Sequence, residues 1–323
     1  MIAAEYVLPL RWADDRGLDE LVEYLERLCS VIDVTVVDGS GPDLFRRHAA
    51  AFPPTVRHLP VQPWPGCNGK VAGVMTGLHA ARHDRVVIAD DDVRYTPQTL
   101  GQVVELLEHA DVVSPQNHFS PRPWHARWDT GRILLNRALG GDFPGTLAVR
   151  RRTLLDAGGY DGDVLFENLE LIRTVRAAGG RHLAAPGLFV ERRPPTARHF
   201  AGQRVRQAYD SFAQPTRLAA ELFILPTLLV IAARSPRRLP LLALASMVVA
   251  ELGRRRAGGR RVFPATSALW APLWLLERGI CSWLAVGQRL RGGVRYSDGR
   301  LARAGTSLGV LRAKHRIARD ASA

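Results

Sequence analysis

Short apolar runs alternate with amphipathic stretches in the N-terminal part of the chain. The runs are typical of buried strands, whereas apolar residues that recur every three or four positions are typical of one face of a helix. Strands that alternate with helices predict an α/β domain built on an open sheet. We predict strands at residues 6–10, 34–37, 86–89 and 145–150, and helices at residues 18–28, 71–81 and 153–157, with another helix from Leu169.

The pattern changes to longer apolar runs in the C-terminal third. Residues 222–233 and 239–250 are strongly apolar and are joined by a basic turn, and residues 269–286 hold tryptophans around Glu277 and Arg278. Each of the first two runs would be about 18 Å long as a helix, whereas a bilayer core of about 30 Å needs about 20 residues. A shallow hairpin, a tilted pair of spans and a buried helical core all fit these two runs. The third stretch suits an interfacial helix, and a buried helical core is the alternative for it as well.

This change of pattern divides the chain into two predicted domains, residues 1–214 and residues 215–323. The length of 323 residues allows one large α/β domain with an appendage. Residues 119–128, which include a Pro-Arg-Pro sequence, are interpreted as a mobile flap. The three cysteines are scattered without the spacing of a metal site or a disulfide framework, which indicates a reducing compartment. No signal peptide is recognised, so we expect the first domain to lie in the cytoplasm.

The chain carries a formal net charge of +13. A charge of this sign is typical of nucleic-acid-binding proteins, but the sequence contains no recognisable nucleic-acid-binding motif. The arginines gather beside the apolar runs, for example at residues 234–238 and 254–261. Basic residues beside apolar segments favour attraction to an anionic membrane leaflet, so we expect a membrane partner and no nucleic acid.

Three consecutive carboxylates, Asp90, Asp91 and Asp92, end the strand predicted at residues 86–89. Ligands of open α/β sheets bind at the carboxyl ends of the strands, and residues two apart in a strand share a face. Asp90 and Asp92 are therefore candidates to hold Mg²⁺ or Mn²⁺, which use few protein carboxylates and leave positions for the oxygens of a diphosphate. The alternative is that these acids only form a turn.

A further acid, Asp38, ends the strand predicted at residues 34–37 and precedes a glycine. An acid at this place suits a ribose hydroxyl or a base edge. Taken alone, Asp38-Gly39 is more typical of a plain turn.

Several short motifs follow one another along roughly the first two-thirds of the chain. They are the strand-ending Asp38, Gly69-Lys70, Asp90-Asp91-Asp92-Val93, Ala157-Gly158-Gly159-Tyr160, Phe166-Glu167-Asn168-Leu169-Glu170 and Gln203-Arg204-Val205-Arg206. This ordered set resembles the family-2 glycosyltransferases of GT-A fold, and the set is far more specific than any one motif. The closest resemblance is to membrane-associated members such as the ceramide glucosyltransferases. It implies a mixed sheet flanked by helices, and inverting transfer of a sugar from a nucleotide-diphosphate donor to an acceptor hydroxyl with Mg²⁺ or Mn²⁺.

Position by position, the resemblance implies a donor site and a metal site. A cation between the two phosphates would stabilise the charge that develops as the diphosphate leaves. A guanidinium would form two parallel hydrogen bonds to the phosphate oxygens of the donor. The implied roles are the nucleoside for Asp38, the nucleotide for Lys70 and Asp90, the metal for Asp90 and Asp92, and the donor diphosphate for Arg206 with Gln203 beside it.

The general base is the irregular part of the resemblance. The family usually has Glu-Asp where this chain has Glu167-Asn168, and the Asp removes the proton from the acceptor hydroxyl. An amide does not accept a proton at neutral pH, so the predicted base is Glu167, with Glu170 behind it. The alternative for Glu167 is a carboxylate that only stabilises the start of a helix.

The sequence thus predicts a GT-A glycosyltransferase that is held at the cell membrane by residues 215–323, with its catalytic domain facing the cytoplasm. A lipid is the favoured acceptor, because the catalytic domain would sit at the bilayer. Two alternatives stay open: a transferase that acts on a polysaccharide, with the apolar segments as core, and a catalytically silent, membrane-bound scaffold. The scaffold is suggested by Asn168 and by Gln207, which stands where the family usually has tryptophan.

Overall fold

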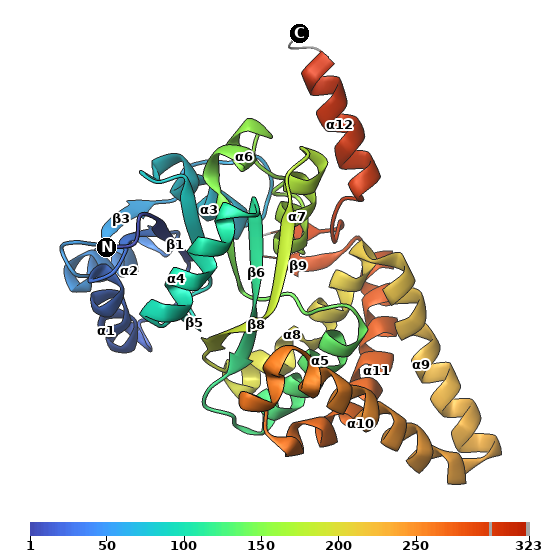
Figure 1. Cartoon of the computed structure of the whole chain (residues 1–323). Coiled ribbons are helices and arrows are strands. Elements are labelled where there is room, and N and C mark those ends of the chain that lie inside the picture. The colour runs from blue at the N-terminus through green and yellow to red at the C-terminus, as the bar shows by residue number, and fades with distance from the viewer. Residues whose placement is uncertain (297–298, 321–323) are drawn as a thin grey trace. The chain divides into compact units, whose positions relative to one another are not determined.

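The computed structural model describes residues 1–296 and 299–320 of the chain, which form two compact units (Figure 1). Unit 1 consists of Met1–Pro115, Pro144–Val190 and the segment that starts at Thr306. Unit 2 consists of Gln116–Phe143 and Glu191–Gly305. Strands β6 (Val112–Phe119) and β8 (His182–Arg192) each begin in unit 1 and end in unit 2.

A mixed sheet of eight strands has the order β3-β2-β1-β4-β7-β6-β8-β5. Strands β3, β2, β1 and β4 pair in parallel, whereas β7 is antiparallel to both β4 and β6. The α/β class and the mixed sheet predicted from the sequence are therefore confirmed. The other strands are β1 (Glu5–Leu10), β2 (Asp33–Asp38), β3 (Arg57–Pro60), β4 (Arg85–Ala89), β5 (Val93–Arg94) and β7 (Thr146–Arg150).

Helices of unit 1 pack against both faces of strand β1. Tyr6 and Leu8 lie in one hydrophobic cluster with residues of α1 and α4, and Val7 lies in a second cluster with residues of α3 and α7. This alternation is what a strand buried on both faces requires. The helices are α1 (Leu18–Cys29), α2 (Pro42–Ala51), α3 (Gly69–Ala80), α4 (Pro97–Glu105), η1 (Leu106–Glu108), α6 (Arg151–Asp156), α7 (Glu167–Ala177) and α12 (Leu308–Asp320).

Each strand and helix predicted for the N-terminal part of the chain is present, with ends shifted by at most two residues. The mobility expected for residues 119–128 stays a prediction, and both ends of that segment are regular structure. Phe119 ends β6, and Trp124 begins helix α5 (Trp124–Leu139), so the irregular connection is short.

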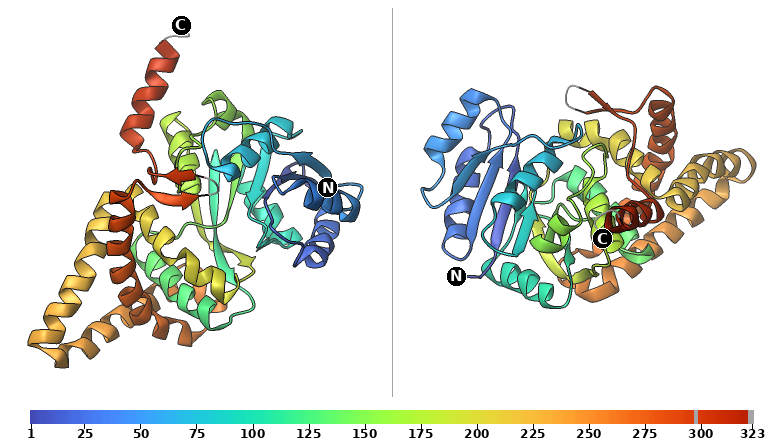
Figure 2. Two further views of the ribbon diagram at one scale, coloured as in Figure 1. Left: turned by 180° about the vertical axis from the view of Figure 1, so that it is seen from behind. Right: turned by 90° about the horizontal axis from the view of Figure 1, so that it is seen from above.

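Unit 2 is mainly helical. Helices α9 and α10 form a hairpin, and α11 packs on both of them (Figure 2). Glycine permits a close approach between α10 and α5, because a Cβ on Gly253 would lie only 1.9 Å from the carbonyl oxygen of Leu134. Besides α5, unit 2 contains α8 (Ala197–Tyr209), η2 (Asp210–Ala213), α9 (Pro215–Arg234), η3 (Pro236–Arg238), α10 (Leu239–Arg255), η4 (Arg256–Arg261), η5 (Ala265–Trp270), α11 (Ala271–Leu290), β9 (Val294–Tyr296) and β10 (Gly299–Leu301).

A network of charged side chains is buried inside unit 2. Arg204 of α8 lies 3.1 Å from Asp129 of α5 and 3.5 Å from Glu277 of α11. Arg132 lies 3.0 Å from Asp129 and 2.9 Å from Asp142. Burial alone would raise the pKa of Asp129, but the two arginines hold it well below its ordinary value. Helices that are far apart in the sequence are thus joined by paired charges.

The apolar runs of the C-terminal third form α9, α10 and α11. Within the part of the chain that the structure describes, α9 alone is long and apolar enough to cross a membrane by length and composition. It has 20 residues, and its most apolar stretch of 18 residues has a mean hydropathy of 1.7 and is 6% buried. In the third run, Trp274 and Arg278 are buried in unit 2, with 5% and 1% of their surface exposed. The burial of these two side chains fits the alternative of a buried helical core at the centre of that run, and the interfacial position of the helix stays a prediction.

The division of the chain by contacts differs from the predicted boundary between residues 214 and 215. Residues 116–143 and 191–214 belong to unit 2 together with the apolar helices. The segment from Thr306 returns to unit 1, where α12 packs on α7.

Candidate active site

The start of helix α3 is fixed by a loop that lies against residues 162–164. Asn68 caps the helix, since its side-chain oxygen accepts the backbone N–H of Lys70 at 3.1 Å. The Asn68 side chain also donates to the carbonyl of Val164 at 2.9 Å. Gly66 has φ +107°, and a Cβ there would lie 2.2 Å from the backbone of Gly162, so glycine is required at this close approach. The loop thereby holds Lys70 beside the start of α7.

Lys70 joins two carboxylates that are distant in the sequence. Its Nζ lies 2.5 Å from Oδ1 of Asp90 and 2.7 Å from Oε1 of Glu167. The three side chains are 14–21% exposed, so the cluster is accessible from solvent but largely enclosed. Burial alone would lower the pKa of Lys70, but the two carboxylates outweigh it and raise the pKa above its ordinary value. We call Lys70, Asp90 and Glu167 the lysine cluster.

The three consecutive aspartates have different surroundings. They form the turn between β4 and β5, because β4 ends at Ala89, so the premise that strand alternation places Asp90 and Asp92 on one face is wrong. The backbone N–H of Asp90 donates to the carbonyl of Gly145 at 2.9 Å. The Asp91 carboxylate accepts the indole N–H of Trp12, and Asp92 is half-buried.

The donor set of this turn fits Mg²⁺ or Mn²⁺ in the company of a diphosphate. No group of three or more His, Cys, Asp or Glu side chains suited to a metal occurs among the residues described. A closed protein cage is not needed for these ions, since Mg²⁺ is commonly held by one or two carboxylates together with substrate phosphates. Asp92 and Asp90, the latter a member of the lysine cluster, supply carboxylates of that kind.

Asp38 is enclosed by its own neighbours at the end of β2. Its Oδ2 lies 2.6 Å from Nδ1 of His48 and 3.1 Å from Nε2 of His58, and its Oδ1 accepts the Ser40 N–H at 2.8 Å. Its side chain is fully buried. Burial would raise the pKa of Asp38, but these contacts hold it well below its ordinary value. The expected contact of Asp38 with a nucleoside stays a prediction, and in this structure the carboxylate binds His48, His58 and Ser40.

The acidic and amide residues at the start of α7 separate in space. Glu167 lies in the lysine cluster, and Asn168 donates from Nδ2 to the carbonyl of Pro144 at 3.0 Å. Glu170 has no exposed surface, and its Oε2 accepts the backbone N–H of Thr306 at 2.6 Å. This placement removes Glu170 from the candidates for the general base and gives it a structural role.

Gln203 and Arg206 belong to helix α8 of unit 2. Gln203 contacts His199 one turn earlier on an exposed face, and the guanidinium of Arg206 lies 4.9 Å from the ring centre of Tyr296. The buried member of the motif is Arg204, which holds the charged network of unit 2. Neither Gln203 nor Arg206 is part of the lysine cluster.

A protein-family model described as "Glycosyltransferase like family 2" matches residues 29–210, which is more than half of the chain. The chain belongs to this family. No match was found among the curated proteins.

Two solved structures of nucleotide-sugar transferases are similar to this family-2 chain. A mannosyltransferase from Pyrobaculum calidifontis, described in complex with GDP-Man and Mn²⁺, is 18% identical with a TM-score of 0.51, over 87% of each chain. A glucosyl-3-phosphoglycerate synthase from Mycobacterium tuberculosis, described with Mn²⁺, UDP and phosphoglyceric acid, is 18% identical with a TM-score of 0.40, over 62% of this chain and 73% of that one. The first match shows the GT-A fold predicted from the sequence.

Two residues near the site of this family-2 chain escaped the sequence analysis. Arg11 follows β1, and its Nη1 lies 3.6 Å from where a Cβ on Gly69 would be, at the first turn of α3. Trp12 contacts Asp91 through its indole and donates its backbone N–H to the Ser40 hydroxyl at 2.9 Å. Their position directly after a strand is the signal that could have found them, because ligands gather at the carboxyl ends of strands.

Proposed function

We propose that this chain is an inverting glycosyltransferase that moves a sugar from a nucleotide-diphosphate donor to a hydroxyl of a membrane lipid, with Mg²⁺ or Mn²⁺. Within the family we place it with lipid-directed members such as the ceramide glucosyltransferases. The observation that carries the proposal is the lysine cluster. Three motif residues from three separate segments meet within 2.7 Å in a chain of this family and fold.

The donor side of the proposal rests on charge. A leaving nucleotide diphosphate carries at least two negative charges, and the cation supplies the electrostatic stabilisation of that charge when it is bound. Asp92 and Asp90 are the residues proposed to hold it. The ammonium of Lys70 adds a fixed positive charge beside Asp90, and its pKa keeps it protonated at neutral pH.

The acceptor side of the proposal rests on Glu167. Its Oε1 is held by Lys70, whereas Oε2 has no hydrogen-bond partner among the residues described and is the atom we assign to the acceptor proton. A base must reach the proton that it takes, and a carboxylate fixed through one oxygen keeps the other oriented. With Asn168 bound to Pro144 and Glu170 buried, Glu167 is the remaining carboxylate of the motif.

The proposal includes a membrane location with the catalytic unit on the cytoplasmic side, and features of unit 2 support it. Helix α9 meets the length and composition of a membrane span. Large apolar side chains such as Phe223 and Leu229 are 71% and 61% exposed, and contiguous apolar surface of this kind marks contact with a membrane or a protein. The basic turn at Arg234, Arg237 and Arg238 suits an anionic leaflet.

The test is donor turnover by purified full-length protein with Mn²⁺. We expect Asp92→Asn to lower the rate of nucleotide-sugar hydrolysis or transfer by about 10²-fold or more, because metal stabilisation of the leaving group is worth several kcal/mol. Asp43→Asn is the matched control, since Asp43 is an exposed aspartate of α2 in the same unit. Equal turnover in the Asp92 and Asp43 variants would refute the metal assignment.

One observation favours a second candidate, a catalytically silent, membrane-bound protein that binds nucleotide. The residue where the family usually has its catalytic Asp is Asn168, and its amide is committed to a backbone carbonyl. Calorimetric binding of a nucleoside diphosphate with Mn²⁺, combined with no turnover across lipid acceptors, would support this candidate. Turnover that depends on Glu167 would exclude it.

A further inference from the structure

Trp12 lies where the carboxyl ends of three strands of unit 1 meet. It follows β1 by two residues, and its backbone N–H donates to the Ser40 hydroxyl beyond β2 at 2.9 Å. Its indole N–H donates to the Asp91 carboxylate beyond β4. The indole also packs nearly perpendicular to the imidazole of His48, with ring centres 5.6 Å apart. One residue thus joins three loops at the edge where open α/β sheets bind their ligands.

On the β2 side, the partners of Trp12 are also partners of Asp38. The Ser40 N–H donates to Oδ1 of Asp38 at 2.8 Å. Nδ1 of His48 lies 2.6 Å from Oδ2 of the same carboxylate. We call Asp38, Ser40 and His48 the Asp38 corner, which is where the nucleoside is expected. Trp12 therefore contacts two of its three members.

On the β4 side, Trp12 holds a turn with three consecutive carboxylates, residues 90–92, which we call the carboxylate turn. Like charges this close together repel one another, so the turn needs partners that fix its conformation. Arg94 fixes the backbone, since its Nη1 donates to the Asp91 carbonyl at 2.6 Å. The indole of Trp12 fixes the middle side chain, whereas the two flanking carboxylates are the proposed cation ligands.

We propose that Trp12 is a positioning residue for the cation. Through Asp91 it holds the carboxylate turn in the conformation that accepts the cation, and through Ser40 and His48 it ties that conformation to the Asp38 corner. Cation and nucleotide then strengthen each other's binding, because both favour the same arrangement of one residue. Preorganisation of this kind lowers the free-energy cost of ordering a loop on binding. The role of Trp12 rests on the metal site of the proposed function, but not on the transfer of a sugar.

Calorimetric titration of full-length protein with UDP and with GDP, each with and without Mn²⁺, tests this role. The measured quantity is the factor by which Mn²⁺ raises nucleotide affinity. Trp12→Phe removes the indole N–H and keeps an aromatic ring beside His48. It should lower the factor by about tenfold, because a hydrogen bond to a charged group contributes about as much as a tenfold change in an equilibrium constant. The affinity without Mn²⁺ should stay unchanged, since the backbone N–H still binds Ser40.

Variants of Asp91 separate this role from an effect on folding. Asp91→Asn keeps an oxygen that accepts the indole N–H, so Trp12→Phe should still lower the factor in that background, although by less because the acceptor is neutral. Asp91→Ala removes the acceptor, so Trp12→Phe should then have no further effect. An unchanged factor in Trp12→Phe alone would overturn the proposal. A loss of equal size with and without the Asp91→Ala change would overturn it as well.

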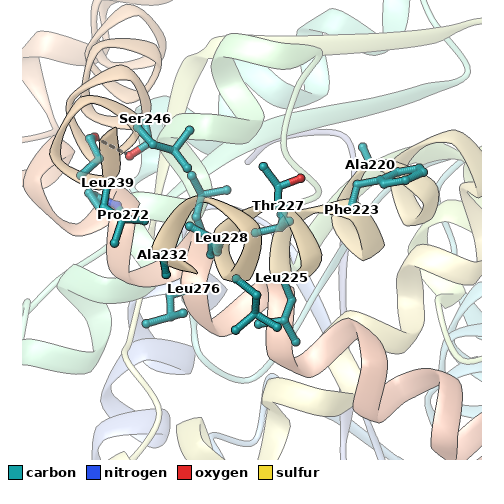
Figure 3. Close-up of a pocket in the computed structure, with 15 residues that line it drawn as sticks. Ala220, Phe223, Leu225, Thr227, Leu228, Ala232, Leu239, Ser246, Pro272 and Leu276 are labelled. Atoms are coloured by element: carbon teal, nitrogen blue, oxygen red, sulfur yellow. Dashed lines mark hydrogen bonds between the residues drawn. The ribbon is translucent and has the colours of Figure 1, made fainter. Parts of the chain in front are cut away.

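Trp128→Phe is the matched control. Trp128 also donates its indole N–H to a carboxylate, that of Glu277 at 3.1 Å, so this variant loses the same kind of bond in unit 2. Its factor should equal that of wild type, and a fall as large as in Trp12→Phe would contradict the proposal. Because α9, α10 and α11 enclose an apolar cavity of about 650 Å³ where detergent can bind (Figure 3), all variants are compared in the same detergent.

Turnover of nucleotide sugars by the same preparations separates this proposal from the proposed function. Mn²⁺-dependent nucleotide binding that requires Trp12 and Asp91, without any turnover, refutes the glycosyltransferase function and leaves the role of Trp12 standing. Turnover together with Mn²⁺-dependent binding that Trp12→Phe does not alter refutes the role of Trp12 and leaves the function standing. Nucleotide binding by wild type that does not respond to Mn²⁺ refutes the metal site, and the role of Trp12 with it.

Discussion

Lys70→Met removes the ammonium group that joins Asp90 to Glu167 and leaves two carboxylates facing the same small space. Removal of one partner from a buried ion pair typically costs about 3–5 kcal/mol, whereas an exposed pair contributes about 0–1 kcal/mol. The three side chains are 14–21% exposed, so the free energy of unfolding should fall by an intermediate amount, about 1–3 kcal/mol. At about 2–4 °C per kcal/mol for a protein of this size, the thermal midpoint should fall by about 2–12 °C.

The pH dependence of this loss follows from the direction of the Lys70 pKa. The folded-state pKa lies above the unfolded value of about 10.4, so the stabilisation is fully present below that pH and is lost as the pH rises through the folded-state value. The difference in thermal midpoint between wild type and Lys70→Met should therefore stay constant from about pH 7 to 9. It should shrink only in stronger alkali.

A chemical assay is available because the chain has two lysines, Lys70 and Lys314. An amine-reactive reagent attacks the neutral amine, and each unit by which a pKa is raised lowers the neutral fraction about tenfold. At pH 8, peptide mass spectrometry should find Lys70 labelled at least about tenfold more slowly than Lys314, which is exposed on α12. Lys314→Met is the control for stability and should leave the thermal midpoint unchanged. Equal labelling of the two lysines, or an unchanged midpoint in Lys70→Met, would refute the reasoning.

Four further predictions concern acidic and amide residues of unit 1. Glu167→Gln should lower turnover by about 10²–10⁴-fold with nucleotide binding retained, as expected for a general base. Glu170→Gln should keep turnover and lower the thermal midpoint, because a neutral amide binds the Thr306 N–H less strongly than a carboxylate does. Kinetic measurements and calorimetry check both. Asn168→Asp should reduce stability by about 1 kcal/mol in chemical unfolding, because a carboxylate cannot donate to the backbone carbonyl that Asn168 now contacts. Asp38→Asn should lower the thermal midpoint at pH 7, and the difference in midpoint from wild type should shrink as the pH falls below about 4. The reason is that the pKa of Asp38 is lower in the folded state than in the unfolded state, which contributes stability only above the unfolded-state pKa. Thermal scans at several pH values measure this difference.

The elements of unit 1 were predictable from the sequence because their signals are local. The apolar run that forms β4 and the recurring apolar positions of α1 can be recognised without knowing their partners. The motifs were recognisable for a similar reason, because each is a short string at the end of a strand or at the start of a helix. Fold and family followed from their order along the chain.

Contacts between distant residues could not be predicted in the same way. Nothing near Asp38 in the sequence indicates that His48 of α2 and His58 of β3 will enclose its carboxylate. The alternation of a strand also ceases to apply where the strand ends, which is why Asp90 and Asp92 were misplaced on a common face. Which donors and acceptors satisfy a buried charge depends on the whole fold.

The predicted boundary at residue 214 illustrates the same limit, because hydropathy records which side chains are apolar and not which segments pack together. Arg204 and Asp129, both before that boundary, depend on Glu277 after it for part of their charge balance. In unit 1, the buried carboxylate of Glu170 depends on the backbone of Thr306. An uncompensated buried charge costs about 3–5 kcal/mol, a large fraction of the stability of an ordinary domain. The residues that carry the family motifs and the C-terminal segments are therefore coupled in folding, although the apolar pattern separates them along the chain.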